Sequence, residues 1–284
     1  KVSTPAAEHL YEINPNGIKL DAAKKEEFHT MVAKALFLCK RARPDLQPTV
    51  PFLCTRVQDP DQDDWKKLLR MLKYMEQTWD EELTLGAEAG DILLPRYYPD
   101  AAFGVHNDMK SHTGNVQTLG RGAANTIYCK QKLNTTSSTE AELVAANDAV
   151  PYALWSKYFL EEQGYDSKTT IYQDNTSAML LEKNGKESSS KRTRHINVRY
   201  FFIKDCIDKG HLTVEHCPTD EMVGDFPSKP LQGSKFKKHK ALIMGHKAIP
   251  HLKQSSQHIG QQECVGAPRS ANKKVSFVDD QDQA

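Results

Sequence analysis

Apolar residues recur at helical spacing through the first third of the chain and predict a helical unit. Between about residues 24 and 41 they follow the helical period, and a shorter apolar stretch at 50–57 is compatible with a second helix. From residue 65 to 75 they fall at i, i+3, i+4 and i+7, behind acidic residues that suit a helix N-terminus. We therefore predict a helical unit at residues 21–82, after a polar segment at 1–20.

The pattern changes near residue 83, where apolar and polar residues begin to alternate in short runs. Three such runs, joined by tight connections, predict antiparallel strands, and helical and β-branched stretches follow them. The expected elements are a strand ending near Asp100, strands at 114–119 and 126–130, a helix at 138–163, a strand at 168–173, helices at 176–183 and 195–209, a strand at 212–216 and a short helix near Asp220. Because a helix between strands usually forms a parallel crossover, this order predicts a mixed five-stranded sheet flanked by helices at 83–232.

Beyond residue 233 the chain turns basic and then loses its pattern. The lysines between Lys235 and Lys253 have no acidic residue among them. Residues 254–284 are rich in Gln, Ser, Asn and Asp, a composition typical of disorder. We predict a basic and then disordered tail at 233–284, whose lysines either bind nucleic acid or only keep the tail solvated.

Composition narrows the class of protein. Of the 284 residues, 38% are hydrophobic and the net charge is +1, so any nucleic-acid surface must come from local clustering. Six cysteines without CxxC pairs argue against structural zinc and a disulfide framework, and favour a reducing compartment. No apolar run is long enough to cross a bilayer, so we expect no membrane partner. Because the chain starts at Lys1 rather than Met, we expect a piece of a longer polypeptide.

Two acidic residues stand at the ends of predicted strands. Asp100 follows Tyr97-Tyr98-Pro99, and Asp174 follows Ile171-Tyr172-Gln173. Either could be an ordinary turn or capping residue. In the predicted topology, however, the first and fourth strands can lie side by side, which brings both carboxylates to one edge of the sheet. Like charges repel unless a cation separates them, so the pair indicates a divalent cation site.

A third acid is expected from the start of the long helix, where two glutamates compete. Both glutamates fit a capping box, which is the structural alternative. Glu140 shares its helical stripe with Leu143, Val144 and Trp155, the apolar face expected to meet the sheet. We therefore predict Glu140 as the ligand and keep Glu142 as the second choice.

Asp225, in Val223-Gly224-Asp225-Phe226, is the fourth and weakest candidate, since Asp220 and Glu221 lie nearby. Two Mg²⁺ or Mn²⁺ ions held by such acids can activate a water and stabilise the leaving oxygen of a phosphodiester. The densest basic cluster could contact phosphates, or could be a solvated loop. Its residues are Lys191, Arg192, Arg194, His195 and Arg199.

Four motifs taken together resemble the C-terminal reverse transcriptase and ribonuclease H region of copia-type retrotransposon polyproteins. Their order and spacing match over about residues 90–245, and the helical block resembles the end of the preceding polymerase region. The motifs are Ser137–Glu142, Ile171–Ala178, Arg192–Tyr200 and Gly224–Leu231.

The resemblance implies an α/β, ribonuclease H-like fold and hydrolysis of the RNA strand of RNA/DNA hybrids. It places two Mg²⁺ or Mn²⁺ ions on the metal-binding acids Asp100, Glu140, Asp174 and Asp225. It implies an upstream polymerase domain as partner, and an intracellular location, in a cytoplasmic retrotransposon particle or in the nucleus. The oligomeric state stays open. The alternative is an inactive remnant that binds nucleic acid or has only a structural role.

Overall fold

The helical unit predicted for the first part of the chain is present. The computed structural model describes residues 1–87, 94–106, 108–185 and 197–249. Three helices form early in the chain: α1 (Ala22–Arg41), α2 (Thr49–Arg56) and α3 (Gln62–Gln77), with a 3-10 turn at Pro44–Leu46. The side chain of Asp21 accepts a hydrogen bond from the Lys24 amide, and Asp61 with Asp64 forms a capping box. Acidic residues therefore begin α1 and α3.

A mixed five-stranded sheet follows, as the sequence predicts, in the order β3-β2-β1-β4-β5. The strands are β1 (Arg96–Ala102), β2 (His112–Thr118), β3 (Asn125–Lys130), β4 (Thr170–Gln173) and β5 (Thr213–His216). The first three strands are antiparallel neighbours, whereas β1 pairs in parallel with β4 and β4 with β5. The expected adjacency of the first and fourth strands is thus confirmed.

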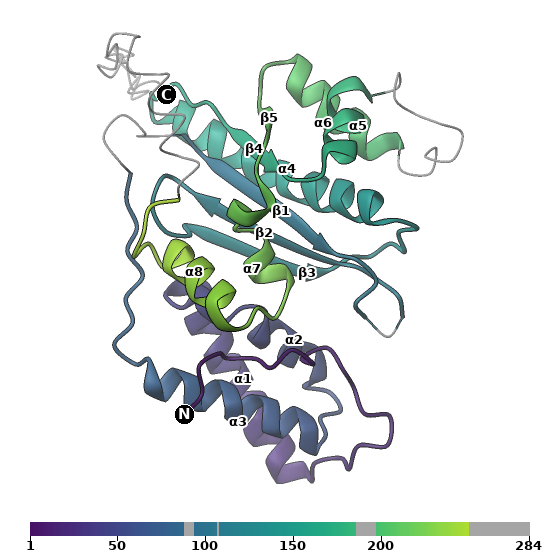
Figure 1. The fold of residues 1–284 in the computed structure, drawn as a ribbon, viewed down its shortest axis with the longest axis vertical. Helices are drawn as coiled ribbons and strands as arrows, with labels where there is room; N and C mark the ends of the chain where they lie inside the picture. The colour runs from purple at the N-terminus through teal and green to yellow at the C-terminus, as the bar shows by residue number, and fades with distance from the viewer. Residues whose placement is uncertain (88–93, 107, 186–196, 250–284) are drawn as a thin grey trace, which may run out of the picture.

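Helices cover both faces of this sheet (Figure 1). On one face lie α4 (Ser138–Glu162), α5 (Thr176–Asn184) and α6 (Asn197–Asp208), and α4 contacts β1 and β2. On the other lie α7 (Asp225–Ser228) and α8 (Gly233–Ile243), preceded by a 3-10 turn at Thr219–Glu221. Residues 195 and 196, where we expected the sixth helix to start, lie outside the described residues.

Alternation along the strands divides the core between the two faces. Tyr97 and Ile171 pack with α4 and α6, whereas their chain neighbours Tyr98 and Tyr172 face α7. The rings of Tyr98 and Tyr172 stack with their centroids 4.9 Å apart. This ring pair holds β1 against β4 close to Asp100 and Asp174.

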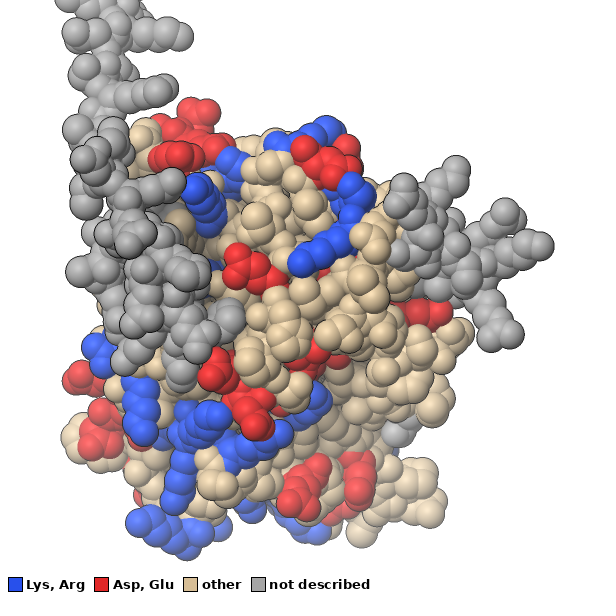
Figure 2. Space-filling view, turned by 45° about the horizontal axis from the view of Figure 1, so that its top comes forward, with Lys and Arg blue, Asp and Glu red and all other residues tan. Residues whose placement is uncertain are grey.

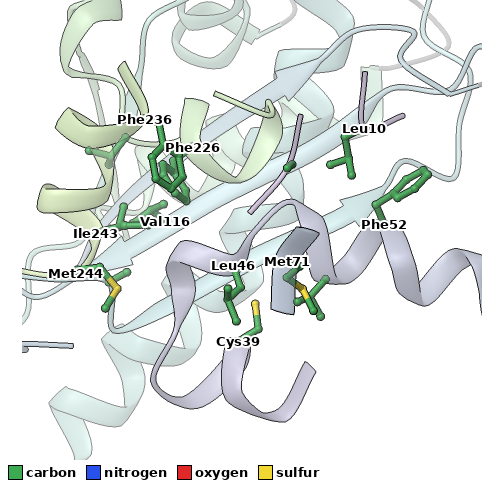
Figure 3. Packing of buried hydrophobic residues seen from close by; sticks show 14 of the residues in the cluster. Leu10, Cys39, Leu46, Phe52, Met71, Val116, Phe226, Phe236, Ile243 and Met244 are labelled. Atoms are coloured by element: carbon green, nitrogen blue, oxygen red, sulfur yellow. The ribbon is translucent and has the colours of Figure 1, made fainter. Parts of the chain in front are cut away.

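The helical unit and the sheet share one hydrophobic core. Figure 3 shows side chains from the N-terminal segment, from α1 to α3, from β2 and from α7 and α8 in the same cluster. The basic composition from residue 233 onward predicts a tail, but Phe236, Leu242 and Ile243 of α8 are buried. Residues 233–249 are therefore part of the folded body. The expected disordered residues 254–284 lie outside the described part of the chain.

Candidate metal centre

Two of the predicted acids meet at the carboxyl ends of β1 and β4. Asp100 is 1% exposed, and Asp174, which directly follows β4, is half-buried. Asp174 is not the N-cap of α5. That role is filled by Asn175, whose side chain accepts a hydrogen bond from the Ala178 amide at 3.1 Å. Asp174 is thus left to face Asp100 across the edge of the sheet.

Glu142 of α4 completes a group of three acids. One carboxylate oxygen from each of Asp100, Glu142 and Asp174 lies within 4.8 Å of the other two. The Oε2 atom of Glu142 is buried and has no hydrogen-bond partner among the residues that the structure describes. An unpaired buried carboxylate oxygen is costly unless a cation or a proton compensates it.

Glu140, the first choice from the sequence, has a different place. Its carboxylate accepts a hydrogen bond from the Thr136 amide at 2.7 Å, and its own amide donates to Ser137 Oγ at 3.2 Å. Glu140 therefore stabilises the start of α4, which is the capping role kept open as its alternative. It is Glu142, the second choice, whose carboxylate lies beside Asp100 and Asp174.

The helical stripe did not identify the glutamate that lies beside Asp100, because the start of α4 is buried on all sides. Every residue from Glu140 to Ala146 is buried, so burial has no helical period here. Trp155, which the stripe placed against the sheet, is 65% exposed. The rotation of α4 is set instead by Ala141 and Ala145, which pack on Ala101 of β1 and bring Glu142 beside Asp100.

Asp225 approaches the three acids from the opposite face, on α7. Two glycines permit this close packing. A Cβ atom on Gly224 would lie 2.3 Å from the Tyr98 carbonyl oxygen, and one on Gly114 would lie 2.8 Å from the Ser228 amide nitrogen. Asp225 is 2% exposed, and Ser228 Oγ donates a hydrogen bond to Asp100 Oδ2.

Lys229, which lies within the motif Gly224–Leu231, also enters the site. Lys229 Nζ lies 3.3 Å from Asp100 Oδ2 and forms an ion pair with Asp225 Oδ1. Lys235 Nζ lies 3.8 Å from Asp225 Oδ2, farther out. The spacing of Asp225 and Lys229, four residues apart, was the available signal for this contact.

The electrostatics of the three acids favour a cation. Burial is the largest cause that raises the pKa of Asp100, and the carboxylates of Asp225 and Asp174 raise it further against the opposing charge of Lys229. Burial and the charges of Asp100 and Asp174 raise the pKa of Glu142 well above its usual value. Burial and Asp225 raise the pKa of Asp174. Each acid is thus destabilised as an anion while no cation is bound between them.

The donor set fits a hard divalent cation. Mg²⁺ takes oxygen ligands at about 2.0–2.1 Å, so oxygens on opposite sides of the ion are roughly 4 Å apart. The oxygens of the three acids lie within 4.8 Å, so small side-chain rotations reach that spacing. Asp100, Glu142 and Asp174 could therefore hold a metal ion, with Asp225 close by as a fourth acid.

The predicted nucleic-acid contacts are mostly outside the described residues: Lys191, Arg192, Arg194 and His195. Arg199 is partly buried on α6, and its charge lowers the pKa of Asp148 on α4 against the larger effect of burial. Within the described ranges, its Nε is buried without a hydrogen-bond partner. In Figure 2, lysines and arginines form separate groups with acids between them, in keeping with the net charge of +1. The phosphate-binding role of the cluster stays a prediction.

The fold and the site together define an α/β protein with a candidate metal centre at the carboxyl edge of its sheet. The sequence is 30% identical over 250 residues to the retrovirus-related Pol polyprotein from transposon TNT 1-94 of Nicotiana tabacum, a match that covers 86% of this chain. It is 31% identical over 238 residues, 83% of the chain, to that from transposon RE2 of Arabidopsis thaliana. The Ty1-H Gag-Pol polyprotein of Saccharomyces cerevisiae is 24% identical over 247 residues, 84% of the chain.

The homologues of this chain are thus retrovirus-related Pol polyproteins of transposons, and the resemblance found in the motifs is confirmed. The chain spans only 18%, 16% and 14% of the length of these three relatives. No protein-family model matches the sequence.

Among solved structures, the chain is similar to an RNase H1 isolated from compost, with 15% identity and a TM-score of 0.32, over 46% of this chain and 88% of that one. This score is low, and the fold class rests on the sheet order described above. None of the helices in the described ranges combines the length and apolar character that crossing a bilayer requires.

Proposed function

We propose that this chain is the ribonuclease H-like part of a retrotransposon polyprotein and hydrolyses the RNA strand of RNA/DNA hybrids. The observation that carries the proposal is the group of three acids contributed by β1, α4 and the end of β4. The order of the motifs around these acids, which resembles the copia-type ribonuclease H region, supplies the substrate class.

In this proposal a bound divalent cation supplies an activated water and stabilises the leaving oxygen of the phosphodiester. Asp100, Glu142 and Asp174 would hold this ion. Ser228 orients the Asp100 carboxylate through its hydrogen bond, and Lys229 holds Asp225 near the site. A second ion, beside Asp225, is the expectation from the resemblance.

Recognition of the hybrid rests on the shape of the duplex and on basic residues of the chain. Substrate choice depends on duplex shape and the RNA 2′-hydroxyl rather than on base edges. The cluster of basic residues between Lys191 and Arg199 supplies phosphate contacts, so affinity falls as salt rises. Because the chain matches only 18% of the length of the Nicotiana polyprotein, the rest of such a polyprotein, with its polymerase region, is the proposed partner.

The test is incubation of the full chain with an end-labelled RNA/DNA hybrid in Mg²⁺ or Mn²⁺. We expect cleavage to RNA fragments with 5′-phosphate and 3′-hydroxyl ends, and its loss in Asp174→Asn. Asp205→Asn is the matched control, because Asp205 is exposed on α6 and forms an ion pair with Lys209, away from the three acids. Salt-sensitive binding without cleavage in either metal would instead favour the inactive remnant.

A further inference from the structure

The Lys229 side chain occupies the space between Asp100 and Asp225. Its Nζ is 3.3 Å from Asp100 Oδ2 and is paired with Asp225 Oδ1. The backbone is fixed at this point, since the Lys229 amide donates to the Asp225 carbonyl oxygen at 3.1 Å and ends α7. The ammonium group is therefore held on the Asp225 side of the acidic group.

This position matters because two metal ions at one site lie close together. In two-metal hydrolytic sites the ions are about 3.5–4 Å apart and share ligands. A first ion at Asp100, Glu142 and Asp174 would leave Asp225 as the remaining nearby acid for a second ion. A second ion held by Asp100 and Asp225 would compete for these two carboxylates with the ammonium, which contacts both of them.

We propose that Lys229 acts as a built-in cation in place of a second metal ion. The chain then binds one divalent ion tightly at Asp100, Glu142 and Asp174, and a second ion binds weakly, only after the ammonium has moved away. The inference rests on the metal site of the proposed function but does not depend on hydrolysis.

The side chain of Lys229 is suited to both states. The lysine ammonium is a compact charge on a flexible stem, and 42% of this side chain is exposed, so it can withdraw into solvent. When the ammonium lies between Asp100 and Asp225, its single positive charge offsets the charge of Asp225. It also repels a neighbouring divalent ion less than a second divalent ion would. Withdrawal leaves Asp225 free to serve as a metal ligand.

The test counts bound ions rather than products. Mn²⁺ is titrated into the metal-free full chain at fixed pH and salt, and free Mn²⁺ is measured by electron paramagnetic resonance. For the wild type we expect one tight ion and a second one that is much weaker. In Lys229→Met we expect the second ion to bind about tenfold or more tightly than in the wild type, because a unit charge a few ångströms away is gone.

Lys235→Met is the matched control. It removes the same charge near the same acid, but the Lys235 side chain is 54% exposed and its Nζ lies 3.8 Å from Asp225, farther out than that of Lys229. We expect its second-ion affinity to change less than threefold or so, as for a solvent-screened charge. Lys229→Arg keeps the charge and is expected to retain the wild-type pattern of one tight ion.

Two equally tight ions in the wild type would overturn the inference, as would a Lys229→Met protein whose second-ion affinity equals that of Lys235→Met. Lys229→Gln provides a second neutral variant if the methionine protein does not fold. Loss of tight Mn²⁺ binding in Asp174→Asn confirms that the first ion occupies the acidic group. A failed cleavage assay would contradict the nuclease proposal and leave these binding results unaffected.

Discussion

The helical unit and the edge of the sheet both bury carboxylates, but they stabilise them in different ways. In the helical unit, Asp45 is fully buried and each of its oxygens is satisfied. Arg43 donates to Oδ1 at 2.8 Å and to Oδ2 at 2.9 Å, and the Tyr74 hydroxyl donates to Oδ2 at 2.7 Å. This is a bidentate ion pair with an additional hydrogen bond.

At the edge of the sheet, three acids lie against one another and share less positive charge. Asp100 accepts a hydrogen bond from Ser228 and shares the charge of Lys229 with Asp225, whereas Glu142 has a buried oxygen that no described residue hydrogen-bonds. Charges that the fold pairs internally contribute to structure, and charges left facing each other mark where an external cation is needed. The contrast distinguishes an acid that the fold pairs internally from the acids of the candidate metal centre, which burial alone does not do.

The largest expected difference between the regions is in activity. Asp100→Asn keeps the shape of the side chain but removes a metal-ligating charge, so we expect the rate of hybrid cleavage to fall about a thousandfold or more. The free energy of unfolding of the metal-free protein should stay the same or rise, because repulsion among the acids is relieved. Single-turnover cleavage and urea denaturation measure the two effects. A large loss of stability would show that Asp100 is a structural acid.

Asp45→Asn should show the opposite behaviour. It leaves the buried guanidinium of Arg43 without its charged partner, which costs about 3–5 kcal/mol of stability. Cleavage activity per folded molecule should be unchanged, because Asp45 lies outside the acidic group. Denaturant unfolding of both aspartate variants under the same conditions gives the comparison. Equal stability of Asp45→Asn and wild type would remove the contrast between the two regions.

The pH dependence of the free energy of unfolding should show that folding opposes ionisation of the three acids at the edge of the sheet, Asp100, Glu142 and Asp174. Because the pKa values of Asp100, Glu142 and Asp174 are raised in the folded state, the folded protein binds protons more tightly there than the unfolded chain. This contribution is complete below the ordinary carboxyl range and is lost as pH rises through the raised values. We expect the metal-free protein to lose it as pH rises above the ordinary carboxyl range, and added Mg²⁺ to restore stability there.

Urea denaturation at several pH values, with EDTA or with Mg²⁺, measures this effect. Asp100→Asn supplies the control, since removing one of the coupled acids should flatten the profile. An identical profile in wild type and Asp100→Asn would contradict the assignment.

The smallest expected effect distinguishes the two glutamates of α4. Glu140→Gln weakens the hydrogen bond to the Thr136 amide and should cost about 1 kcal/mol of stability, with little change in Mn²⁺ affinity. Glu142→Gln should weaken Mn²⁺ binding and leave the stability of the metal-free protein equal or higher. Isothermal titration and thermal unfolding of the pair test both statements. Weaker binding in Glu140→Gln alone would restore the sequence-based choice.

Much of the fold was predictable because local periodicity carries it. The alternating runs gave the strands, and the long apolar stretch gave α4 at Ser138–Glu162, close to the expected 138–163. The adjacency of β1 and β4 followed from the crossover between them, and with it the meeting of Asp100 and Asp174. The lysine content of residues 233–249 concealed α8, whose few apolar residues are buried against the helical unit and the sheet.

The sequence by itself determined which elements form, in what order, and that two acids end adjacent strands, because these features depend on short-range patterns and on chain connectivity. Tertiary structure decided that Glu142 rather than Glu140 joins them, since the packing of Ala141 and Ala145 on Ala101 sets the rotation of a helix start with no exposed face. It also decided the place of Lys229. The side chain reaches Asp100 only because Gly114 and Gly224 let α7 lie directly on the sheet, a contact between segments more than a hundred residues apart.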